Sequence, residues 1–135
     1  MDKLIKRVLS EEIENDSEHL IAHRDRMYVR IEMVLPKLVH FLEQYLKEYN
    51  LYSIDVTDGR SSYATWVKNQ ITGKSELYSG DIKILTLRFV NLMNYQRTEI
   101  KRDVISKIED VFAIPVREYM IPLDVKFINL VDSEF

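Results

Sequence analysis

The chain has 135 residues, 46% of them hydrophobic and 30% charged, which is enough apolar material for the core of one domain. Its 19 basic and 22 acidic side chains leave a net charge of −3, which excludes binding of polyanions through an overall positive field. The absence of cysteine excludes disulfides, thiolate metal sites and a cysteine nucleophile.

The first 50 residues carry the pattern of amphipathic helices. Apolar residues between positions 2 and 14 recur at helical spacing, which places on one face Leu4, Ile5, Val8, Leu9 and Ile13. An acidic block follows at 11–18, and from Met27 to Tyr49 a second apolar stripe recurs every three or four residues. Pro36 lies inside this stripe. Because proline lacks an amide proton, we expect either a kink in one long helix or a break between two helices of a hairpin.

The apolar pattern then changes to a period of two, which is typical of β-strands. Alternating residues at 52–57 predict a first strand. Asp58-Gly59 predicts the turn that ends it, because glycine tolerates positive φ. The aromatic and β-branched residues of 62–71 predict a second strand.

The segment after the Thr72-Gly73 turn signal has two interpretations. Residues 76–90 are typical of a central strand, because they are apolar on both faces near their end. A helix over 81–93 also fits, since some of the same apolar residues recur at a period of 3.6. The β-branched content favours the strand, and Thr72-Gly73 then closes a hairpin.

The remaining elements are one helix and one strand. Thr98 is predicted to cap the helix, and Pro115 is predicted to end it. Alternation of apolar and polar residues over 121–127 predicts the last strand, with Pro122 at its start or on a sheet edge.

Together these elements predict one α+β domain over 1–135, in the order α-α-β-β-β-α-β. The helical part, 1–50, is a helical hairpin or one long kinked helix packed on a small, mainly antiparallel sheet. The sheet and the remaining helix occupy 51–135. No linker composition and no internal repeat divides the chain.

The sequence contains no recognisable catalytic or cofactor motif. The three glycines, at 59, 73 and 80, have spacings that exclude a dinucleotide fingerprint and a P-loop. His19 and His23 share a helical face but lack the acidic partners at the spacing that a metal centre requires. We therefore expect no metal, no cofactor and no enzymatic activity.

The wide apolar arc of the helical part requires cover on more than one side, so we expect a partner there. Tyrosine and tryptophan suit interfaces because one end is apolar and the other forms hydrogen bonds. The expected interface residues are Tyr28, Leu35, Leu42, Tyr45, Tyr49 and Trp66. The leading hypothesis is a structural or adaptor subunit of a larger assembly, bound to another protein or to itself as a homodimer. Small α+β subunits of phage tails and secretion machines have this general size and character, which is a similarity of fold class only.

Two alternatives remain open. A basic helix face formed by Arg24, Arg26 and Arg30 would suit a nucleic-acid-associated regulator. Neighbouring acidic residues neutralise these arginines, so nucleic acid is not the expected partner. A small-molecule binder or small enzyme would instead have a pocket between helix and sheet, lined by Tyr45, Tyr52 and Trp66.

The sequence predicts no contact with a membrane. No stretch approaches the roughly 18 consecutive apolar residues of a spanning helix. Charged residues interrupt the first positions within two residues of Met1, so we expect no export signal and a cytoplasmic location.

Overall fold

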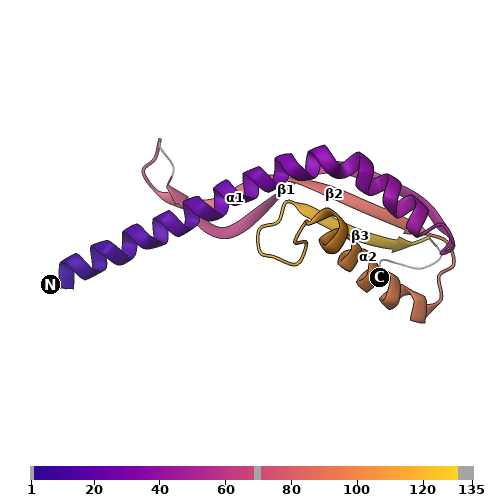
Figure 1. The fold of residues 1–135 in the computed structure, drawn as a ribbon. Coiled ribbons are helices and arrows are strands. Elements are labelled where there is room, and N and C mark those ends of the chain that lie inside the picture. Colours follow the sequence, from indigo (N-terminus) through magenta and orange to yellow (C-terminus); the bar gives the residue numbers. More distant parts are fainter. Residues whose placement is uncertain (1, 69–70, 131–135) are drawn as a thin grey trace.

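The computed structural model describes the backbone of residues 2–68 and 71–130, and the side chains of 18–63, 67 and 71–130. It has two helices and a three-stranded sheet, which confirms the α+β class (Figure 1). In chain order the elements are α1 (Asp2–Tyr45), β1 (Leu51–Lys68), β2 (Ser75–Phe89), α2 (Asn94–Phe112) and β3 (Leu123–Asn129).

The helical part is one helix, so the expected second N-terminal helix is wrong and the single long helix is right. α1 continues through Pro36 without a break and follows a curved path along the sheet (Figure 1). Pro36 lies on the exposed side of α1. Buried leucines before and after it, Leu35 and Leu38, pack in the same core and hold the two halves of the helix together.

The two strands predicted before residue 72 are one continuous strand. Asp58 and Gly59 do not form a turn, because they pair with Lys83 and Ile82 in the middle of the antiparallel β1–β2 ladder. The predicted hairpin turn at 72–73 is confirmed, with Gly73 at a φ of 71°. The strand continues past Asp58 although the apolar alternation ends there, because a glycine is tolerated inside a strand that bends.

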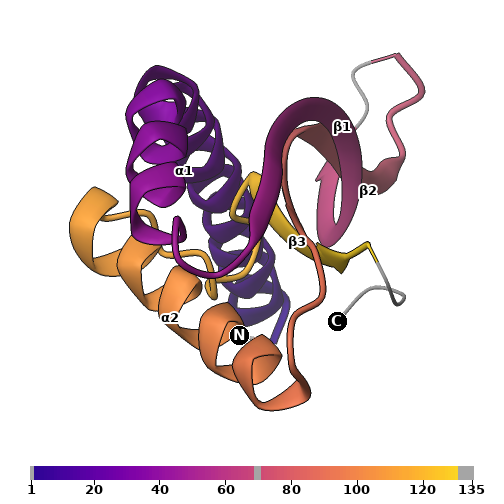
Figure 2. The same ribbon diagram turned by 90° about the vertical axis from the view of Figure 1, so that its right-hand side faces the viewer.

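The β1–β2 hairpin is a strongly coiled ribbon, and β1 curls over in Figure 2. Two-stranded ribbons twist more than wide sheets do. Gly59 and Gly80 fall on the same face of the ribbon, because Gly59 pairs with Ile82, two residues beyond Gly80. A Cβ atom on Gly59 would lie 2.8 Å from Cδ1 of Ile84. The absence of a side chain at Gly59 therefore leaves room for Ile84 on this face of the ribbon.

β2 is the central strand, so the strand interpretation of this segment is confirmed and its helical alternative is wrong. It pairs with β1 on one side and with β3 on the other, in the order β1-β2-β3. The β1–β2 pairing is antiparallel and the β2–β3 pairing is parallel, so the sheet is mixed. Pro122 directly precedes β3, an edge strand, as its missing donor requires.

α2 connects the two parallel strands. It begins at Asn94, one turn before the predicted cap at Thr98. The side chain of Gln96 instead accepts a hydrogen bond of 3.2 Å from the backbone N–H of Met93. α2 ends at Phe112, where Ala113 adopts a left-handed conformation with a φ of 53°.

The core lies between the sheet and the two helices, which sit together on one side of it (Figure 2). α1 contributes a leucine-rich stripe, α2 contributes three buried aliphatic residues, and β2 contributes Leu85, Leu87 and Phe89. The side chains with no exposed surface include Ile31, Leu38, Leu42, Leu46, Leu85, Leu87, Phe89, Val104 and Ile108. This arrangement leaves one flank of α1, and the part of α1 before the sheet, uncovered.

Candidate functional site

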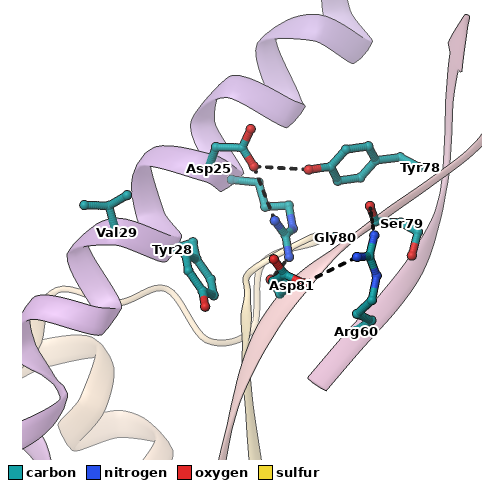
Figure 3. A pocket seen from close by; sticks show the side chains of 9 residues that line it. Asp25, Tyr28, Val29, Arg60, Tyr78, Ser79, Gly80 and Asp81 are labelled. Atoms are coloured by element: carbon teal, nitrogen blue, oxygen red, sulfur yellow. Dashed lines mark hydrogen bonds and ion pairs between the residues drawn. The ribbon is translucent and has the colours of Figure 1, made fainter. Parts of the chain in front are cut away.

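Arg24 marks the place where α1 meets the coiled ribbon. Five of the six residues at 18–23 are exposed, and Arg24 is the first buried residue among the described side chains of α1. Only 3% of its surface is exposed, which is rare for a cation and requires compensating partners. Figure 3 shows this region as a notch between the helix and the two strands.

The partners of Arg24 come from both strands of the ribbon and from α1 itself. Its guanidinium lies 5.5 Å from the ring centre of Tyr63 and 5.5 Å from that of Tyr78. One terminal nitrogen donates a hydrogen bond to the carbonyl of Asp81, and the other lies 3.3 Å from the carboxylate of Asp25. The positive charge is therefore held by two aromatic rings, a carbonyl and a carboxylate.

Gly80 makes this arrangement possible. A Cβ atom at position 80 would lie 2.6 Å from Cζ of Arg24, which is closer than real Cβ contacts allow. The planar guanidinium therefore lies directly against the backbone of β2. A glycine inside a strand often marks such a close approach.

Opposite charges balance around the notch, which encloses about 310 Å³. Arg60 lies 3.7 Å from the carboxylate of Asp81 and donates a hydrogen bond of 3.3 Å to the carbonyl of Ser79. Together with the pair of Arg24 and Asp25, the notch holds two arginines and two aspartates. This geometry clamps α1 to the ribbon.

Tyr78 connects the clamp to solvent. Its hydroxyl donates a hydrogen bond of 3.1 Å to the carboxylate of Asp25 (Figure 3). Burial raises the pKa of the Tyr78 hydroxyl, and the hydrogen bond to Asp25 raises it further, while the nearby Arg24 charge opposes both effects. The folded protein therefore favours the neutral phenol.

The substitution Tyr78→Phe is expected to flatten the dependence of stability on pH above about pH 10. The folded protein keeps a proton that the unfolded chain releases near pH 10. The contribution of Tyr78 to stability is therefore complete below pH 10 and is lost as the pH rises above it. Urea denaturation at pH 8, 10 and 11 measures this, and an equal pH slope in the two proteins would contradict the prediction.

The predicted interface residues are distributed between the core and its edge. Leu35 and Leu42 are buried under the sheet and α2, so they are not available to a partner, and including them in the interface was wrong. Most of the wide apolar arc of α1 is covered within the chain, because α2 packs beside the sheet, whereas Met33 stays exposed. Tyr28, Tyr45 and Tyr49 are half-buried. The side chain of Trp66 lies outside the described residues.

The three arginines of the predicted basic face do not lie together. Arg24 is buried in the clamp, on the opposite side of the helix from Arg26, which is exposed. Arg30 is also exposed and donates a hydrogen bond of 3.1 Å to the carbonyl of Phe112 at the end of α2. Residues two apart on a helix point about 200° apart, so a face that includes both Arg24 and Arg26 cannot form.

The predicted pocket between helix and sheet is not formed by the expected residues. Tyr45 packs against Phe41, with ring centres 6.0 Å apart, and Tyr52 is 70% exposed at the start of β1. A second cavity of about 430 Å³ lies beside the ribbon, and its lining mixes apolar residues and two tyrosines with the polar and charged residues Ser61, Arg117, Glu118 and Asp124.

Sequence reasoning did not identify the clamp. The sequence pattern predicts Arg24 on a solvent-facing surface, and it does not single out Tyr63, Tyr78 or Gly80 as site residues. The available signal was Gly80 itself, a glycine inside an otherwise well-formed strand. It indicates that another group approaches the backbone, although it does not say which one.

Within the described part of the chain, no three His, Asp or Glu side chains lie close enough together to hold a metal ion. None of the described helices has the length and apolar run needed to cross a bilayer. Comparisons with protein-family models, with curated proteins and with solved structures found nothing that matches this chain. The fold and the clamp define the protein as a small α+β domain with one long, partly uncovered helix.

Proposed function

We propose that this protein is a non-catalytic interaction or structural subunit, and that α1 is the element through which it binds another protein chain. The observation that carries the proposal is the length of α1 relative to the rest of the fold. The helix extends well beyond the sheet and α2 at its N-terminal end (Figure 1). The clamp at Arg24 fixes the direction in which this extension leaves the domain.

The sequence of the extension supports an interaction role. The stripe that buries Met27 continues one heptad earlier at Leu20, which is 41% exposed. A further heptad earlier lies Ile13. Apolar residues at this spacing are typical of helices that pack on another helix.

A photo-crosslinking amino acid at position 20 tests the proposal. We expect ultraviolet light to link Leu20→benzoylphenylalanine to a protein chain, either a second copy or another protein, in cells that produce the protein. The same group at Lys47, an exposed residue just beyond α1, is the matched control. Mass spectrometry of the adducts identifies the linked chain.

The crosslinking experiment has outcomes that support the interaction role and outcomes that contradict it. Discrete protein adducts at position 20, but not at position 47, support an interaction role for α1. Equal labelling at both positions, or none above background at position 20, contradicts it. Unchanged thermal unfolding of both variants is the check that the fold is intact.

A further inference from the structure

The uncovered flank of α1 carries one continuous line of residues at alternating steps of four and three, the repeat of a helix–helix contact. Its described members are all exposed: His19, His23, Arg26, Arg30, Met33 and Lys37. Met33 is 76% exposed, although it is a large apolar side chain. This line, called the outer stripe below, faces away from the sheet.

The outer stripe continues into the extension with the opposite charge. The same steps lead from His19 back to Asp16 and Glu12, and then to Leu9 and Ile5. One helical line is therefore basic where α1 is docked on the sheet and acidic where α1 extends beyond it. A second copy of the same helix, running in the opposite direction, would present the complementary order of charges.

We propose that two copies of the protein pair through the outer stripes of α1, antiparallel and with the twofold axis at residue 21. The residue numbers of every facing pair then add up to 42, and all members of the stripe are matched at once: Ile5 with Lys37, Leu9 with Met33, Glu12 with Arg30, Asp16 with Arg26, and His19 with His23. This inference rests on the proposed function and names its partner.

The chemistry of the facing pairs fits this register. Two ion pairs, Glu12 with Arg30 and Asp16 with Arg26, occur twice by symmetry, and each Met33 meets Leu9 of the other copy. A shift of the register by one heptad in either direction separates both ion pairs and no longer sets Met33 against Leu9. Arg30 remains able to form the ion pair with Glu12, because a guanidinium has five N–H donors and, among the described residues, Arg30 donates to the Phe112 carbonyl alone.

The shape of the domain also permits this arrangement. The sheet and α2 cover α1 from about Arg24 onward, so a twofold axis at residue 21 places the two domains at opposite ends of the helix pair. Each extension then lies along the docked half of the other α1. The overlap from residue 5 to residue 37 is about 48 Å long at 1.5 Å per residue.

A charge-exchange experiment tests the register. Variant A carries Arg26→Asp and Arg30→Glu, and variant B carries Glu12→Arg and Asp16→Arg. Light scattering on nuclease-treated protein is expected to show a dimer for the native chain. The dimer dissociation constant should rise at least about tenfold in A and in B, because each variant replaces four attractive contacts by repulsive ones. An equimolar mixture of A and B restores every ion pair and should regain the dimer mass.

The control variant reverses two exposed charges away from the stripe, Lys47→Glu and Lys126→Asp, and should remain a dimer. Because the mixture must recover, loss of mass through misfolding of A or B cannot imitate the expected result. A native monomer, dimers that persist in A and B, or a mixture that fails to recover would each overturn the pairing. Loss of co-purifying nucleic acid in A, without any change of mass, would overturn it in favour of a polyanion ligand.

The test is independent of the test of the proposed function. If position 20 crosslinks to a different protein and the native chain is monomeric, the interaction role stands and the self-pairing fails. If position 20 yields no protein adduct and the chain is monomeric, both fail.

Discussion

Replacing Gly80 with alanine is expected to lower the free energy of unfolding by about 3 kcal/mol. The added Cβ would lie 2.6 Å from Cζ of Arg24, so the guanidinium must leave its place against β2. Arg24 would then lose its hydrogen bond to the carbonyl of Asp81 and its contact with the backbone of β2. A buried charge without its partners is among the few causes of a large loss from a single methyl group.

Two comparisons separate this mechanism from a general effect of glycine. Gly73→Ala should cost only about 1 kcal/mol, from its positive φ, because nothing lies within 4 Å of a Cβ there. In an Arg24→Ala background, Gly80→Ala should cost less than about 1 kcal/mol, because the clash has gone. Denaturant unfolding of the four proteins measures both. Equal costs of Gly80→Ala with and without Arg24 would contradict the clamp.

Replacing Phe89 with alanine is expected to lower the free energy of unfolding by about 3–5 kcal/mol. Phe89 ends the central strand, has no exposed surface and is among the largest fully buried side chains. Its removal opens a cavity between β2 and the helical layer. The pairing partner of Phe89 in β1 is Leu51, so the loss also reaches the start of the ribbon.

Tyr52, the next residue after Leu51, supplies the control. Its ring is 70% exposed, so Tyr52→Ala should change the free energy of unfolding by no more than about 0.5 kcal/mol. Urea denaturation followed by circular dichroism compares the two variants. A cost below about 1 kcal/mol for Phe89→Ala would mean that the end of β2 is not packed under the helices.

Local patterns in the sequence predicted those elements whose environment is set by their own residues. The period of α1 and the alternation of β2 and β3 follow from which side of each element is buried. Pro36 left open whether the chain forms one kinked helix or two helices, because the loss of one backbone hydrogen bond is the same in both cases. The core of α1 decided between them, since Leu35 and Leu38 pack against the same sheet on either side of the proline.

The errors arose where distant contacts override a local signal. Asp58-Gly59 has the composition of a turn. In the structure, however, the carboxylate of Asp58 lies 2.5 Å from Nζ of Lys83 across the ribbon. The burial of Arg24, which the sequence does not predict, has the same cause. An arginine on a helix is normally solvated. Apart from Asp25, the partners of Arg24 come from the ribbon that coils over it, and the Asp81 carbonyl lies 57 residues later in the chain.

The interface residues predicted from the sequence are only partly on the surface of the chain. The reasoning that a wide apolar arc needs cover was sound, but α2 supplies that cover, which removes Leu35 and Leu42 from any surface. The flank that stays open is polar, and its order of charges becomes informative only once α1 is known to be one uninterrupted helix. A break at Pro36 would have separated Lys37 from the rest of the stripe.

The most direct test of the account is a distance between the two copies of α1. Because the chain has no cysteine, Val29→Cys and Lys37→Cys each allow one spin label per copy. Antiparallel pairing about residue 21 predicts label separations along the helix axis of about 24 Å at position 29 and about 48 Å at position 37. Pulsed electron–electron double resonance measures both distances. The absence of dipolar coupling at both positions, or short distances at both, as parallel helices would give, would contradict the account.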